Sequence, residues 1–207
     1  TVNAYYNPLM NEIVFPAAIL QPPFFFMDAD DAVNYGGIGA VIGHELSHGF
    51  DDSGSRFDGD GNLNNWWTAE DRSEFEKRAN QLVAQYSEYE PIPGMKLNGK
   101  LTLGENIGDL GGINIALEAY KISLKGKPAP VLDGLNGQQR FFMGFGQIFR
   151  RKYRPEELRR RLFVDPHSPS RFRVNGIVRN VDVFYEVFEV ESGQKLYLPP
   201  KQRVRIW

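Results

Sequence analysis

The segment 34–49 most constrains what this chain can fold into, because it places two histidines and a glutamate inside an apolar helical pattern. Four apolar residues recur in it at the spacing of one helix face, namely Ile38, Val41, Ile42 and Leu46. We therefore predict a buried helix from Asn34 to about Gly49. In that helix His44 and His48 lie one turn apart and face the same way, so two imidazoles can bind one metal ion.

Glu45 completes the pattern H-E-x-x-H. It is offset from both histidines, close enough to reach a water molecule at the metal but poorly placed to be a ligand itself. It is therefore the candidate general base. The pattern has only three fixed positions and also arises by chance in unrelated helices. Burial of three polar groups without partners is costly, however, and this favours a metal site.

A catalytic zinc site needs a third protein ligand and one open position. The chain has no cysteine, so the strong ligands available are His, Asp and Glu. The segment 104–109 offers Glu105 as the third ligand and Asp109, one turn further on, as the acceptor of a hydrogen bond from a ligand imidazole. Asp51, three residues after His48, is the alternative third ligand. Glu105 could also be a solvated acid at a helix start, where the helix dipole favours it.

The rest of the chain is predicted to be mainly helical. A short strand is expected at 12–15, and a helix should begin after Thr68, whose hydroxyl can cap it. Another helix should run from Leu103 to about Ser123, and further helical patterns cover 137–152, 155–162 and 181–188. The helix from Leu103 carries four glycines, each costing up to about 1 kcal/mol, which indicates that another element approaches its backbone closely.

Length and composition favour one folded domain over residues 1–207. The 207 residues are 42% hydrophobic and 24% charged, which is typical of a globular chain. No apolar run approaches the roughly 20 residues that a membrane helix needs, so we expect no membrane segment. The first 100 residues hold 6 Lys/Arg against 15 Asp/Glu, and the remainder hold 18 against 11. The basic stretch 150–161 could contact nucleic acid, but charge runs usually mark a solvated face, and we expect no nucleic-acid partner.

The third histidine, His167, lies in a loop bounded by Pro166 and Pro169. Loops of this kind often carry functional side chains. A surface histidine without a function is the other interpretation, and the loop alone does not decide between them.

Several motifs follow one another along the whole chain: Asn3-Ala4-Tyr5-Tyr6, Leu20-Gln21-Pro22-Pro23-Phe24-Phe25, His44-Glu45-Leu46-Ser47-His48-Gly49-Phe50-Asp51-Asp52, Trp66-Trp67-Thr68, Gly104-Glu105-Asn106-Ile107-Gly108-Asp109, Tyr153-Arg154-Pro155-Glu156, His167-Ser168-Pro169 and Trp207. Together they resemble the neprilysin family of zinc peptidases, which includes endothelin-converting enzymes and bacterial oligopeptidase O. The resemblance implies a mainly α catalytic domain with a small β element, of the thermolysin-like zincin type.

The resemblance also implies roles for individual residues. It assigns one Zn²⁺ per chain to His44, His48 and Glu105, with Glu45 as the base and Asp109 orienting a ligand imidazole. It further implies that His167 stabilises the oxyanion. It also implies a set of substrate-binding residues. Asn3 and Ala4 would bind the substrate backbone, and Arg173 a substrate carbonyl. The pocket for the residue after the cleaved bond would be lined by Phe24, Val41, Ile148 and Phe149.

We therefore expect a zinc endopeptidase that cuts oligopeptides before hydrophobic residues. Family members are much longer, with an N-terminal helical portion that closes over the cleft, so this chain is expected to be a fragment with that portion as its partner. The alternative is a zinc-bound but inactive fragment that needs the missing portion. The lack of cysteine favours a bacterial enzyme, in the cytoplasm or the periplasm and cell envelope, over the disulfide-containing animal enzymes.

Overall fold

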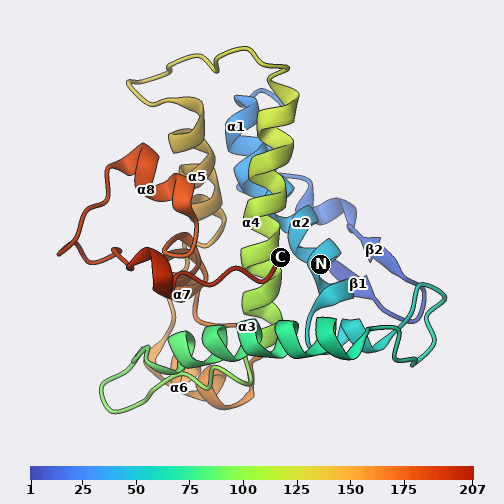
Figure 1. Ribbon diagram of the computed structural model, residues 1–207. Helices are drawn as coiled ribbons and strands as arrows, with labels where there is room; N and C mark the ends of the chain where they lie inside the picture. The colour runs from blue at the N-terminus through green and yellow to red at the C-terminus, as the bar shows by residue number, and fades with distance from the viewer.

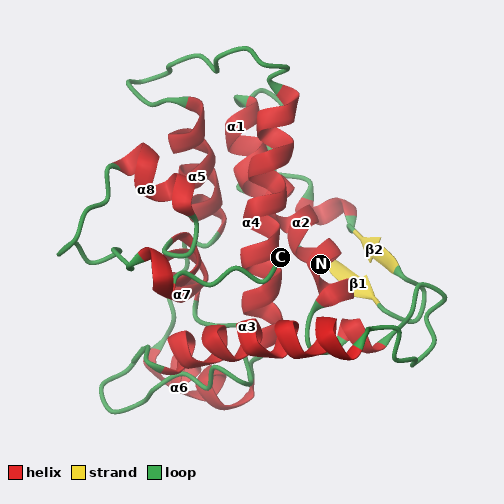
Figure 2. Cartoon of the chain, in the orientation of Figure 1, coloured by secondary structure: helices red, strands yellow, loops and turns green.

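The computed structural model describes residues 1–207, and most of its ordered structure is helical (Figure 2). The helices are α1 (Asp31–Asn34), α2 (Ala40–Ser47), α3 (Ala69–Ser87), α4 (Leu103–Ser123), α5 (Gly137–Ile148), α6 (Pro155–Val164), α7 (Ser170–Val178) and α8 (Asp182–Phe188). The only sheet is an antiparallel hairpin of β1 (Tyr5–Asn7) and β2 (Glu12–Val14), in which Tyr5 pairs with Val14. The expected fold class, mainly α with a small β element, is confirmed.

Helix α4 runs through the middle of the molecule, with α2 against it and α3 crossing its N-terminal end (Figure 1). The glycines of α4 explain how closely α2 can lie. A Cβ atom on Gly108 would come within 2.8 Å of the His44 ring, and one on Gly112 within 2.7 Å of the His44 backbone nitrogen. The prediction that another element approaches the backbone of α4 is therefore correct, and that element is the histidine-bearing helix.

The helix expected from Asn34 to Gly49 is not one regular α-helix. A π-helical turn over Tyr35–Gly39 joins α1 to α2, and a 3₁₀ turn over His48–Phe50 ends it. The predicted apolar face is also partly wrong, because Ile42 and Leu46 are 40% and 45% exposed. The face of α2 that packs on α4 carries Gly43, His44 and Ser47, all of which are buried.

The main core comprises 27 buried residues, drawn mostly from α3, α4, α5, α7 and α8. Helix α3 begins as predicted, with Thr68 capping it by accepting from the Asp71 N–H. Helix α5 ends at Ile148 and not at 152. Helix α6 begins at Pro155, and Arg154 before it is extended, as a following proline favours. Helix α7 was not predicted, since its polar residues interrupt any simple apolar stripe.

A second, smaller apolar cluster connects the hairpin to the start of α2. It consists of Ala4, Ile19 and Ile38, with Phe24 and Val41 packed against it. The Ile38 N–H donates to the Phe24 carbonyl at 2.8 Å, which ties the loop before α1 to the π-helical turn. None of the helices is both long enough and apolar enough to cross a membrane.

Candidate metal and catalytic site

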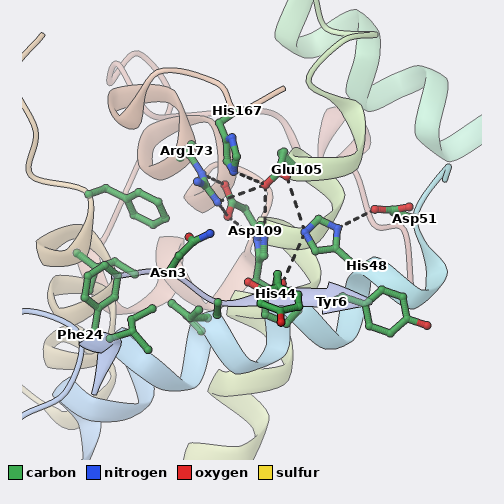
Figure 3. Close-up of a pocket in the computed structure, with 18 of the residues that line it drawn as sticks. Asn3, Tyr6, Phe24, His44, His48, Asp51, Glu105, Asp109, His167 and Arg173 are labelled. Atoms are coloured by element: carbon green, nitrogen blue, oxygen red, sulfur yellow. Dashed lines mark hydrogen bonds and ion pairs between the residues drawn. The ribbon is translucent and has the colours of Figure 1, made fainter. Parts of the chain in front are cut away.

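His44 in α2 and His48, the first residue of the 3₁₀ turn after it, present their Nε2 atoms to the same carboxylate. The His44 and His48 rings are edge-to-face with centroids 4.5 Å apart. Their Nε2 atoms lie 3.2 Å and 3.9 Å from the Glu105 carboxylate oxygens. Glu105 comes from the first turn of α4, so the pairing of α2 with α4 produces this group. Figure 3 shows the three side chains converging.

The opposite ring nitrogens are each held by an aspartate. His44 Nδ1 lies 2.9 Å from Asp109 Oδ1, and His48 Nδ1 lies 2.7 Å from Asp51 Oδ2. Carboxylates that bind Nδ1 orient an imidazole so that Nε2 faces a metal ion. Asp109 therefore lies where an orienting residue is needed, as the resemblance implied.

Asp51 was the alternative candidate for the third metal ligand, but its contacts place it on the far side of His48. One oxygen is bound to His48 Nδ1, and the other accepts from the backbone N–H groups of Ser53 and Gly54 at 2.8 Å and 2.7 Å. Its carboxylate thus lies behind His48, away from the Nε2 atoms. The i, i+3 spacing from His48 is the signal in the sequence that indicates this second orienting aspartate.

The arrangement fits a metal ion with nitrogen and oxygen ligands. Donor atoms of His44, Glu45 and His48 all lie within 4.8 Å of one another. Glu105 Oε2 is buried and makes no hydrogen bond of normal geometry, even though imidazole nitrogens lie near it. An unsatisfied buried carboxylate oxygen is costly unless a cation completes it. Two imidazoles and a carboxylate are a typical set for catalytic zinc.

Burial and neighbouring charge set the electrostatics of this group. Burial would lower the pKa of His44, but the Asp109 and Glu105 carboxylates raise it to about 9. Burial would raise the pKa of Glu105, but the His167 and His44 imidazoles hold that pKa well below its usual range. Glu45 differs, because burial raises its pKa and outweighs the opposing effect of the two histidines. A carboxylate with a raised pKa is better suited to taking up a proton.

His167 reaches the site from the loop between α6 and α7. Its Nε2 lies 3.1 Å from Glu105 Oε2, and its Nδ1 lies 2.9 Å from Asp165 Oδ1. Asp165 also pairs with Arg161 at 2.6 Å, so the aspartate is itself held in place. Asp165 was not predicted as a site residue, although it stands two residues before the histidine in a proline-bounded loop.

Arg173, in α7, forms a two-point ion pair with Asp109. Its Nε and Nη2 atoms donate at 2.7 Å and 2.6 Å, and its guanidinium lies 4.8 Å from the centre of the Phe149 ring. Asp109 thus joins His44 to Arg173. These contacts place Arg173, the residue expected to contact a substrate carbonyl, beside the site.

One cavity of about 440 Å³ brings these groups together with the residues expected to bind substrate. Its lining includes every residue of that set: Asn3, Ala4, Phe24, Val41, Ile148, Phe149 and Arg173. Figure 3 places Phe24 on one side of the cavity and His48 with Asp51 on the other. Tyr6 and Arg151 also line the cavity and were not anticipated.

Comparison with known proteins gives a consistent result. The family model of Peptidase family M13 matches residues 3–204. Mouse (Mus musculus) endothelin-converting enzyme 1 is 45% identical over 210 residues, covering 100% of this chain and 27% of that protein. Human (Homo sapiens) neprilysin is 44% identical over 212 residues, covering 100% of this chain and 28% of that protein. The chain thus spans under a third of the length of these relatives.

Solved structures match in fold as well as in sequence. The zinc metalloprotease Zmp1 of Mycobacterium tuberculosis, in complex with an inhibitor, superimposes with a TM-score of 0.98 at 62% identity, covering 100% of this chain and 32% of that one. PepO from Lactobacillus rhamnosis gives a TM-score of 0.88 at 39% identity, covering 98% of this chain and 31% of that one.

Proposed function

This chain belongs to peptidase family M13, and from that premise we propose that it is the catalytic part of a zinc endopeptidase that hydrolyses oligopeptides on the N-terminal side of hydrophobic residues. The observation that carries the proposal is the convergence of His44, His48 and Glu105 beside Glu45, in a cavity whose other side is apolar.

Zinc would be held by His44 Nε2, His48 Nε2 and the Glu105 carboxylate. Asp109 and Asp51 would keep the two imidazoles in the tautomer that has a free Nε2 lone pair, because each accepts a hydrogen bond at Nδ1. When bound, zinc polarises the scissile carbonyl and makes water a stronger nucleophile.

The protein's own groups would then move the protons. Glu45 takes a proton from water as the water oxygen attacks the carbonyl carbon of the scissile peptide. Glu45 passes that proton to the amide nitrogen as the C–N bond breaks, leaving a carboxylic acid and an amine. His167 donates a hydrogen bond from Nε2 to the carbonyl oxygen as negative charge develops there. Because Asp165 accepts the Nδ1 proton, His167 would donate from Nε2 as the imidazolium. Burial would lower the pKa of His167, but the Glu105 and Asp165 carboxylates raise it and favour that charged form.

Selection of the substrate would come from the apolar side of the cavity. Phe24, Val41, Ile148 and Phe149 line it, and they can bury the side chain that follows the cleaved bond. Asn3 and Ala4 precede β1 directly, where an extended peptide could meet their backbone and amide groups. Arg173 would contact a substrate carbonyl.

The test is cleavage of defined peptides by the zinc-loaded chain, with products identified by mass spectrometry. We expect cleavage before Phe, Leu and Ile, and cleavage at least about 100-fold slower by the Glu45→Gln variant. Equal cleavage before Asp or Lys would contradict the proposed specificity. Stoichiometric zinc without turnover would instead support a fragment that binds metal but requires the longer protein for activity.

A further inference from the structure

His167 cannot owe its position to packing. Its side chain is 44% exposed, and it lies in the short loop 165–169 between α6 and α7. Yet its Nε2 stands 3.1 Å from Glu105 Oε2, close to where the reacting groups would be. A displacement of about 1 Å in such a group can lower turnover by about 100-fold. Something other than burial of the ring must therefore hold the loop.

The neighbouring residue provides that anchor. Ser168 is 2% exposed, and its hydroxyl donates to Asn106 Oδ1 at 2.9 Å, across 62 residues of sequence. Asn106 is 1% exposed, and its Nδ2 donates to Thr102 Oγ1 at 3.0 Å. Because Thr102 donates its own hydroxyl proton to a backbone carbonyl, the amide of Asn106 has one orientation, with its oxygen left for Ser168.

This anchor stands on the helix that also carries the proposed metal ligand. Glu105 and Asn106 are consecutive in α4, so their side chains leave the helix about 100° apart. Glu105 points into the cavity, while Asn106 points to the loop of His167. One rigid turn of α4 thus sets the distance between Glu105 and His167.

We propose that Asn106 and Ser168 are positioning residues that hold His167 at its working distance from Glu105. The catalytic role of His167 in this inference rests on the proposed function, whereas the hydrogen bond between Asn106 and Ser168 does not depend on it. Neither Asn106 nor Ser168 lines the cavity, so neither touches substrate. Their removal should therefore lower kcat through His167 and leave ground-state binding nearly unchanged.

The experiment compares Ser168→Ala and Asn106→Leu with a matched control, Asn180→Ala. Asn180 is 3% exposed and its amide donates to Gln85 Oε1 and to the Gly176 carbonyl, but it does not line the cavity. In the zinc-loaded protein we expect the first two variants to lose about 10- to 100-fold in kcat with KM within about twofold. The control should lose thermal stability but not kcat.

Two further measurements show whether the effect passes through His167. In a His167→Ala background, adding Ser168→Ala should lower kcat no further, because the group that it positions is gone. The backbone N–H of His167 donates to Asp165 Oδ1 at 2.9 Å. Hydrogen exchange of this backbone amide should become faster in both anchor variants but not in the control.

The proposal is overturned if the anchor variants fold and keep wild-type kcat, if the double variant shows an additive loss, or if exchange at His167 is unchanged. If the wild-type protein shows no turnover, the proposed function fails, and the exchange measurement still decides whether the anchor exists. Ser168→Ala, which removes a single hydroxyl, carries the test if Asn106→Leu does not fold.

Discussion

The two sides of the cavity are built in opposite ways. The polar wall, which we define as His44, His48, Asp51, Glu105 and Asp109, is held by hydrogen bonds and ion pairs that link α2, α4 and the loop after α2. The apolar wall, defined as Phe24, Val41, Ile148 and Phe149, comes from the loop before α1, from α2 and from the end of α5, and is held by packing.

The difference between the walls determines how each responds to change. Removing one member of the polar wall leaves a buried partner without its hydrogen bond, at a cost of about 1–3 kcal/mol. Removing a methylene from an apolar contact costs about 0.8 kcal/mol and leaves the other apolar contacts in place. We therefore expect abrupt effects on chemistry from the polar side and graded effects on selectivity from the apolar side.

The largest effect is expected for Glu45→Gln, which tests the chemistry beside the polar wall. The amide cannot take a proton from water, so kcat should fall by about 100-fold to 10,000-fold. The zinc content, measured by atomic absorption, should be unchanged, because Glu45 is not among the proposed ligands. Loss of zinc together with activity would make Glu45 a structural member of the polar wall.

His167→Ala should have the next largest effect. Loss of one donor to a developing oxyanion typically lowers kcat by about 100-fold to 1,000-fold, while KM changes little. Steady-state kinetics on one peptide would measure both. Arg173 is the competing donor, because it also lines the cavity. If Arg173→Ala lost kcat at constant KM while His167→Ala raised only KM, the two roles would have to be exchanged.

Asp51→Ala tests whether the aspartate that binds His48 Nδ1 strengthens zinc binding by orienting that histidine. Loss of a residue that orients a metal ligand typically weakens metal binding by about 10- to 100-fold. Competition with a chelator at fixed pH would measure it. Asp60→Ala, at an exposed turn, is the matched control and should leave the zinc affinity unchanged. Equal effects of the two substitutions would refute the orienting role.

The smallest and most graded effect is expected on the apolar wall. Peptides that differ only in the residue after the cleaved bond should be ranked by buried size, with about fourfold in kcat/KM per methylene, the equivalent of about 0.8 kcal/mol. A series from Ala through Val to Leu would measure this slope. An abrupt preference for one side chain would show that polar contacts, and not burial, select the substrate.

Much of the site is determined by local sequence. An i, i+4 pair in a helix faces one way whatever surrounds it, so His44 and His48 were paired by their spacing alone. The glycines of α4 indicated a close neighbour, because glycine is otherwise unfavourable within a helix. Segment 104–109 offered Glu105 as the third ligand, with Asp51 as the alternative. The resemblance to a known family chose Glu105 and supplied the role of His167 and the apolar wall, and the structure brings all of them to one cavity.

Only the tertiary structure decided which face of α2 is buried and which acids meet which imidazoles. Helical periodicity marked Ile42 and Leu46 as inward, yet α4 packs against the face with His44, because its own carboxylates compensate the buried polar groups there. Whether Asp51 or Glu105 meets Nε2 depends on the packing of α4 against α2. Spacing along the chain fixes directions within one helix, but contacts between helices depend on how their surfaces fit.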